Sequence, residues 1–148
     1  MRLFISHKPA LYLLLACLVS LLAACAGERP TTLGVQQGGR LAPCPESPNC
    51  VTSFASGGHH AIAPLAADLD AITQVLLQLD KANIISTEEN YLYAEFTTRL
   101  MGFVDDVEFL FDPVEHLTHV RSASRVGYSD LGANRDRIEE IRAALTVR

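Results

Sequence analysis

The spacing of apolar residues changes from helical to strand-like near residue 83, and this change limits the folds that the chain can adopt. From Leu65 to Leu79 the apolar residues recur three or four positions apart, which is typical of a helix with one face on a core. We predict a helix from Leu65 to about Ala82, with Pro64 just before it. After residue 83 apolar and polar residues alternate, which indicates half-buried strands.

Four strands are expected after the change of period, followed by a second helix. The strands are predicted at residues 83–87, 91–100, 104–111 and 117–124. A short strand at residues 51–54 would add an edge. Apolar residues between 138 and 145 have helical spacing, with Asn134 or Asp130 as the N-cap. The pattern predicts an α+β fold, an antiparallel sheet of three to five strands with two helices packed on one face.

The N-terminal segment matches a lipoprotein signal. Two basic residues precede an apolar stretch that is short for a membrane span and ends in Leu22-Ala23-Ala24-Cys25. These four residues resemble the bacterial lipobox, in which the cysteine is acylated and the chain is cut before it. We therefore expect residues 1–24 to be removed and the exported protein to be attached to a membrane through acylated Cys25. Because Ala26 is not the aspartate that retains enterobacterial lipoproteins in the inner membrane, we expect the outer membrane, facing the periplasm.

Cleavage would leave an acidic domain on a tether. Ten of the twelve basic side chains remain against seventeen acidic ones, a formal net charge of −7. An acidic balance argues against a nucleic-acid partner, because nonspecific binding to nucleic acid requires excess Lys and Arg. Residues 25–42 contain several glycines and few apolar side chains, so we predict a flexible tether there. Residues 43–148 form the predicted single domain.

Two cysteines remain after Cys25, and we expect them to form a disulfide. Cys44 and Cys50 would pair in an oxidising compartment. The alternative is a metal site, but two thiolates supply only half of a tetrahedral set. The histidine pairs His59-His60 and His116 with His119 match a ligand pattern only loosely. The sequence therefore predicts neither a metal nor a cofactor.

Three sequence runs together resemble one known family. They are residues 44–53 (CPESPNCVTS), 102–109 (GFVDDVEF) and 121–135 (RSASRVGYSDLGANR), with Arg137-Ile138-Glu139 following. On these runs the chain resembles the domain-of-unknown-function 1499 family (DUF1499), and the resemblance covers residues 43 to 145. It implies an exported or lipid-anchored bacterial protein, and it supplies no activity and no catalytic residue.

One face of the predicted sheet carries polar and aromatic side chains, and no predicted helix is left to cover it. Strand alternation brings these side chains to the same side of the sheet. We expect an open surface for a ligand or partner. Its candidate residues are Tyr91, Tyr93, Glu95, Arg99, Asp106, Glu108, His119 and Arg121.

A second group of candidates follows the last predicted strand. The free amide groups of the second helix, with nearby arginines, could hold a phosphate or carboxylate. In the structural alternative, the arginines pair with carboxylates across the sheet, and Asp130 and Asn134 cap turns and the helix. The residues of this group are Arg121, Arg125, Tyr128, Asp130, Asn134, Arg135 and Arg137.

The sequence predicts a noncatalytic binding or interaction domain, because it contains no catalytic motif. Asp105 and Asp106 are adjacent on a strand and point to opposite faces, which argues against an acid–base pair. One alternative is an envelope hydrolase that uses either aspartate with His119 or Arg121. Another is a purely structural envelope component. The expected partners are the membrane and either an envelope protein or a small anionic ligand.

Overall fold

The computed structural model describes Tyr12, residues 27–98 and residues 101–147. Cys25 and the rest of the predicted signal segment apart from Tyr12 lie outside the described residues, as does Arg99 of the predicted surface. Within the described part of the chain, no helix is long and apolar enough to span a bilayer.

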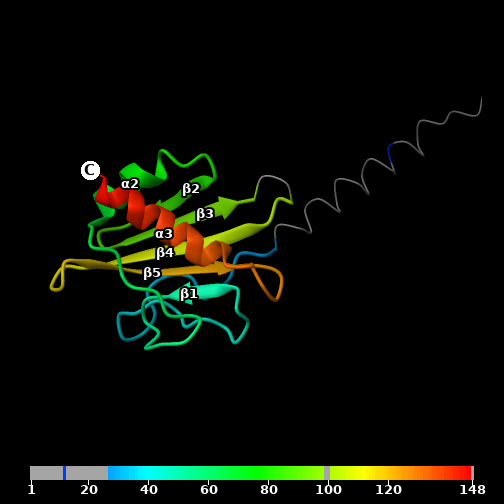
Figure 1. Ribbon diagram of the computed structural model, residues 1–148, viewed down its shortest axis with the longest axis horizontal. Helices are drawn as coiled ribbons and strands as arrows, with labels where there is room; N and C mark the ends of the chain where they lie inside the picture. The colour runs from blue at the N-terminus through cyan, green and yellow to red at the C-terminus, as the bar shows by residue number, and fades with distance from the viewer. Residues whose placement is uncertain (1–11, 13–26, 99–100, 148) are drawn as a thin grey trace, which may run out of the picture.

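Five antiparallel strands form a single sheet (Figure 1). They are β1 (Cys50–Thr52), β2 (Ala82–Thr87), β3 (Tyr91–Thr97), β4 (Val104–Asp112) and β5 (Leu117–Ser124). Their spatial order is β1-β5-β4-β3-β2, so β4 is central and β1 and β2 are the edges. The four strands predicted after the change of period are present, and β1 corresponds to the predicted edge strand.

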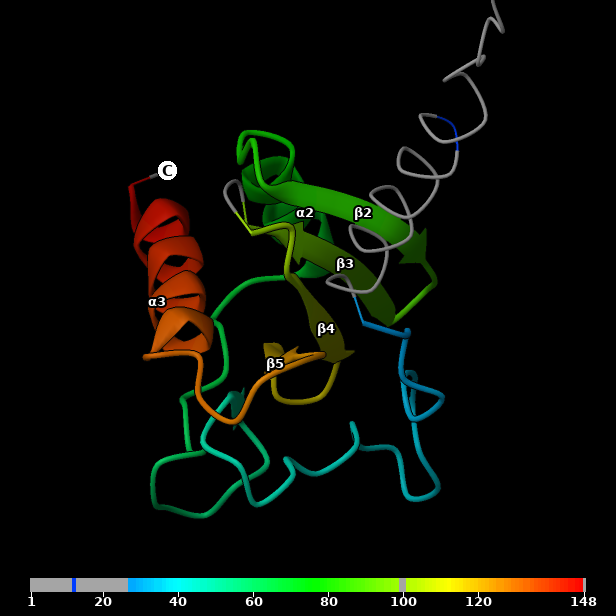
Figure 2. The same cartoon turned by 90° about the vertical axis from the view of Figure 1, so that its right-hand side faces the viewer.

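Two helices, α2 (Leu69–Leu76) and α3 (Ala133–Thr146), pack together on one face of the sheet (Figure 2). Their apolar side chains meet those of the strands in the main core, as the two spacing patterns predicted. The predicted α+β architecture is thus confirmed. The core includes Leu69, Ile72, Val75, Leu76, Leu92, Ala94, Phe96, Val107, Phe109, Val120, Ile138 and Ile141.

Helix α2 is shorter than the predicted helix over residues 65–82. Leu65 is extended and pairs with Thr118, with hydrogen bonds of 2.8 Å in both directions between their backbones. The helix begins only after Asp68, whose carboxylate accepts a 2.8 Å hydrogen bond from Ala71 N as the N-cap. Leu65 is fully buried in this extended position, so its apolar character is satisfied without a helical turn.

The face of the sheet opposite the helices is covered by the N-terminal part of the chain, so the prediction of an open face is wrong (Figure 2). Leu41 packs with Tyr91 and Tyr93 in a second apolar cluster. Gly34 N donates a 2.8 Å hydrogen bond to Glu108 Oε1. Residues 27–42, predicted as a tether, therefore lie against the sheet. Composition did not indicate this, because the contacts use backbone amides and only a few apolar side chains.

Cys44 and Cys50 are joined by a disulfide, with their Cα atoms 5.7 Å apart. Cys50 opens β1, and Cys44 follows the segment that covers the sheet. The bond therefore ties the end of the covering segment to an edge strand.

Candidate functional site

The covered face of the sheet contains a network of arginine, carboxylate and tyrosine side chains, which we call the covered-face network. Arg125 binds Asp106 through Nε (3.0 Å to Oδ2) and Nη2 (2.7 Å to Oδ1), and it also pairs with Glu95. Arg29 reaches the same Glu95 from the covering segment at 2.6 Å. The Tyr93 hydroxyl lies 2.5 Å from Asp106 and accepts a 3.0 Å bond from Arg125. β3 and β4 supply the acids, and the chain after β5 supplies the central cation.

The pKa shifts of Glu95, Arg125 and Tyr93 each favour the ordinary charge state of that group at neutral pH. Burial alone would raise the pKa of Glu95, but hydrogen bonds from Arg29 and Arg125 outweigh it and lower that pKa. The bond to Asp106 raises the pKa of Arg125. Burial, and then the bond to Asp106, raises the pKa of Tyr93. The network is therefore an internal ion cluster and is not arranged to exchange protons.

Glu108 is a third carboxylate on the covered face, and it is fully buried. It accepts from Gly34 N at 2.8 Å, from the Tyr91 hydroxyl at 3.0 Å and from Arg121 at 3.3 Å. Burial raises its pKa, although the bonds from Gly34 and Arg121 act in the opposite direction. Among the described residues, Arg121 Nε is a buried side-chain atom with no hydrogen-bond partner. The Glu108–Arg121 pair is thus less completely satisfied than the pair around Arg125.

A separate network lies on the helix-facing side of the sheet and holds α3 in place. Arg137 forms an ion pair with Asp105 and lies 4.8 Å from the centre of the Phe96 ring. Its Nη1 donates to Asn134 Oδ1 at 2.6 Å and to Ser122 Oγ at 2.9 Å. These contacts connect the first turns of α3 to β3, β4 and β5.

Asn134 is the centre of the helix-facing network. Its Nδ2 donates to Asn49 O at 2.9 Å, to Ser124 Oγ at 3.0 Å and to Asp130 Oδ2 at 2.8 Å. The side chain is fully buried, so each of these bonds replaces one that water would otherwise make. One amide therefore connects the loop before β1, the end of β5 and the start of α3.

The predicted anion site at the start of α3 is filled by groups of the protein itself. Asp130 accepts from Gly132 N at 3.0 Å and from Asn134 N at 2.8 Å. Burial alone would raise the pKa of Asp130, but these backbone bonds outweigh it and lower that pKa. Arg135 donates to the backbone oxygens of His59 and Ala61, both at 2.8 Å. The helix amides and the arginines thus have internal partners, which agrees with the structural alternative.

The two aspartates and His119 of the hydrolase alternative do not come together. Asp105 bonds Arg137 on the helix side, while Asp106 bonds Arg125 on the covered side. In the β4–β5 register Asp106 faces Ala123, and His119 lies four residues earlier on β5. At about 3.3 Å per residue, that offset separates them by about 13 Å along the strand.

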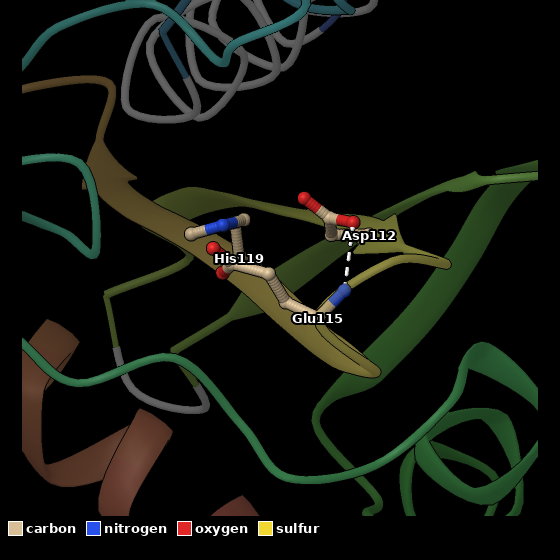
Figure 3. Close-up of side chains that lie close together, drawn as sticks. All are labelled: Asp112, Glu115 and His119. Carbon is tan, nitrogen blue, oxygen red and sulfur yellow. Dashed lines mark hydrogen bonds between the residues drawn. The ribbon is translucent and has the colours of Figure 1, made fainter.

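His119 belongs instead to a cluster at the β4–β5 turn that the sequence did not single out (Figure 3). Ligand atoms of Asp112, Glu115 and His119 all lie within 4.8 Å of one another, a combination that can bind a cation. His119 Nδ1 is 3.1 Å from Ser53 Oγ. Asp112 also accepts from the amides of Val114 and Glu115, which lower its pKa and hold the turn. Strand pairing could have revealed the cluster, because it makes Asp112 and His119 diagonal neighbours across the hairpin.

A cleft of about 670 Å³ lies between α3, the loop that joins α2 to β2 and the end of β3. Leu79 and Phe96 give it an apolar floor. Its lining also includes three carboxylates (Asp80, Asp136 and Glu140), two cations (Lys81 and Arg137), Gln78, Thr97, Thr98 and Ala133. Among the predicted site residues that the structure describes, only Arg137 lines it. The sequence did not indicate this cleft, because its residues come from three distant segments and show no motif.

The other predicted surface residues are scattered. Tyr128 is exposed in the loop between β5 and α3, away from Tyr91 and Tyr93. Asp106, Glu108 and Arg121 are at least nine-tenths buried.

A comparison with protein families identifies the chain, while comparisons with curated proteins and with solved structures find no match. The model of the family described as "Protein of unknown function (DUF1499)" matches residues 40–145. The match includes all five strands, both helices and the disulfide. The chain therefore belongs to the DUF1499 family of proteins of unknown function.

Proposed function

We propose that this protein is a lipid-anchored component of the cell envelope. In this proposal residues 1–24 are a signal peptide, Cys25 is acylated, and the domain faces the periplasm from the outer membrane. The lipobox-like run before Cys25 supports it. The Cys44–Cys50 disulfide adds independent support, because such bonds persist in oxidising compartments outside the cytoplasm.

Within the envelope, the domain is a noncatalytic module that binds a protein partner. The candidate arginines and carboxylates are paired with each other, so they are not free to bind a ligand. The cleft beside α3, by contrast, is lined by the apolar side chains of Leu79 and Phe96, and this observation supports the proposal. Three carboxylates line that cleft, and Arg137 is already neutralised by Asp105, which favours a neutral or basic partner segment. A small anion would have to displace internal carboxylates from the arginines.

Mass spectrometry of the full-length protein, expressed in a bacterium with two membranes, tests the anchor. We expect an N-terminal peptide that begins at Cys25 and carries acyl chains, recovered in the outer-membrane fraction. A Cys25→Ser variant should keep residues 1–24 or lose the acyl mass. A wild-type protein that is not acylated would overturn the proposed anchor.

Site-specific photocross-linking tests the binding role. A photoreactive residue at Gln78, on the cleft, should yield a defined adduct in native envelopes, and the same residue at Glu89, in the exposed β2–β3 turn, should not. Charge reversal with Asp136→Lys and Glu140→Lys should remove the Gln78 adduct if the carboxylates select the partner. Equal labelling from both positions would contradict binding in the cleft.

A purely structural envelope role is the second candidate, and the internal pairing of the arginines favours it. It predicts that no variant of the cleft changes any envelope interaction while the domain remains folded. The charge-reversal variants therefore distinguish the two roles.

A further inference from the structure

The continuously described segment packs tightly against the domain from Gly27, two positions after the residue expected to carry lipid. Gly27 lies so near the end of β5 that a Cβ there would come within 2.9 Å of Arg125 Cβ and of Val126 Cγ1. Arg29 is then held by Glu95. Cys25 precedes Gly27 by two residues in the sequence, and two residues of chain span at most about 7 Å. An acyl anchor on Cys25 would therefore hold this end of the domain directly at the bilayer.

The same end of the sheet presents exposed apolar side chains. The β3–β4 turn and the β5–α3 loop meet at this end, since Phe96, Asp105 and Ser124 are aligned in the register (Figure 1). Tyr128 is 77% exposed and Leu131 is 95% exposed, both in the β5–α3 loop. Met101 in the β3–β4 turn is 57% exposed. We call Met101, Tyr128 and Leu131 the anchor-end surface.

Neither contacts within the chain nor the backbone preference of leucine explains why a leucine occupies position 131. It has a φ of 55°, in the left-handed region that leucine rarely occupies because its side chain strains the backbone there. Hydrogen bonds nevertheless hold the loop: Ser129 Oγ accepts from Leu131 N at 3.2 Å, and Asp130 accepts from Gly132 N at 3.0 Å. The loop thus presents its apolar side chains to solvent in a fixed position.

We infer that the anchor-end surface lies in the interface of the bilayer that holds Cys25, so that the domain is docked in one orientation. This inference rests on the proposed acylation of Cys25. Tyrosine suits the headgroup level of a bilayer, and exposed leucine gains by entering its apolar edge. The formal net charge of −7 after cleavage opposes anionic lipids, so the surface suits uncharged phospholipid headgroups.

Docking in this orientation raises the far end of the sheet above the membrane. Val114, 86% exposed in the β4–β5 turn, marks that end (Figure 1). β4 separates the two ends by nine residues, or about 30 Å at about 3.3 Å per residue. This separation is several times the depth of about 5–10 Å to which interfacial side chains enter a bilayer. The Asp112, Glu115 and His119 cluster would then face away from the lipid.

A tryptophan placed at either end reports the orientation, because the chain contains no tryptophan of its own. Full-length acylated protein with Tyr128→Trp, Leu131→Trp or the control Val114→Trp is reconstituted in phosphatidylcholine vesicles that contain spin-labelled lipid. We expect several-fold stronger fluorescence quenching, with a blue-shifted emission, for the Tyr128 and Leu131 variants than for the Val114 variant. All three sites are exposed, and two reporter positions ensure that misfolding of one variant does not decide the result.

Mass measurement and vesicle flotation of the same preparations separate failure of the anchor from failure of the docking. Acylated protein that floats but shows equal quenching in all three variants overturns the docked orientation and leaves the proposed anchor standing. Protein without acyl chains that does not float overturns the anchor and the docking with it.

Discussion

At the residue scale, Arg125 illustrates how burial changes the role of a charged side chain. Its partner Asp106 is fully buried, and a carboxylate in that position needs a cation or hydrogen-bond donors close by. Arg125 supplies both, and the Tyr93 hydroxyl adds a further contact. The residue that the sequence placed on a binding surface therefore neutralises charge inside the fold.

Arg125→Ala should lower the free energy of unfolding by about 3–5 kcal/mol, because it leaves Asp106 buried without its cation. Lys81→Ala, at an exposed position, is the control and should change it by about 0.5 kcal/mol or less. Urea unfolding of both variants measures the difference. An Arg125→Ala protein as stable as the wild type, yet altered in its envelope cross-links, would show that Arg125 serves binding instead.

Glu95 makes the free energy of unfolding depend on pH, and the groups around Glu95 set the sign of that dependence. Burial opposes the shift, but Arg29 and Arg125 hold its pKa below the ordinary value of 4.5, so the folded state binds this proton more weakly than the unfolded state. The stabilisation is present above pH 4.5 and is lost as the pH falls through the folded pKa. Glu95→Gln should therefore flatten the decline of unfolding free energy below pH 4.5. In a pH series of urea unfolding curves, the exposed-turn control Glu88→Gln should keep the wild-type slope.

At the element scale, α3 is positioned by polar contacts as much as by its apolar face. Ile138 and Ile141 are fully buried in the main core, as their spacing predicted. The start of the helix depends on Asn134, which was predicted as a possible N-cap and in fact lies inside the first turn. The N-cap is Gly132 and neither Asn134 nor Asp130, although the Asp130 carboxylate accepts from Asn134 N. Spacing locates such a helix, but it does not show at which residue the helix begins.

Asn134→Ala should lower the free energy of unfolding by about 3 kcal/mol, since it leaves Asn49 O and Ser122 Oγ buried without this partner. Asp136→Ala, exposed in the same turn, should cost about 0.5 kcal/mol through the helix dipole alone. Thermal unfolding followed by circular dichroism compares the two variants. Equal losses would contradict the central role of Asn134.

At the scale of the whole molecule, the N-terminal segment adds a third layer to the helices and the sheet, because it covers the face of the sheet opposite the helices. Leu33 and Leu41 pack with Tyr91 and Tyr93, and Gly34 donates to the buried Glu108. Without this layer those side chains would meet water, and the carboxylate would lose a backbone donor. The segment between the expected anchor and the first strand is therefore part of the folded domain.

A chain that begins at Pro43 should be less stable than one that begins at Gly27 by about 4 kcal/mol. Burial of Leu41 contributes about 2 kcal/mol, and the hydrogen bond from Gly34 to Glu108 about 2 kcal/mol more. Urea unfolding of the two chains, both with the Cys44–Cys50 disulfide intact, measures the loss. Equal stability would mean that the covering layer is not an integral part of the fold.

The sequence indicated much of the architecture because apolar spacing reports which side of an element meets a core. It predicted β2 to β5, both helices and their common face. It also gave, as one of two readings, the pairing of Arg121 and Arg125 with Asp105, Asp106 and Glu108. It could not show that the segment before residue 43 covers these side chains. That segment contacts the sheet through the backbone amide of Gly34 and the side chain of Arg29, and both meet their partners only after folding.

The sequence by itself determined the fold class and the family, because periodicity and long motifs are properties of local order along the chain. The tertiary structure alone decided which charged groups are buried, where the cleft beside α3 lies and which end of the sheet adjoins the expected anchor. Those features arise where segments distant in sequence come together, and burial then fixes the charge and the partners of each side chain. For this protein, the same arginines could line an open surface or an internal network, and only the position of residues 27–42 distinguishes the two.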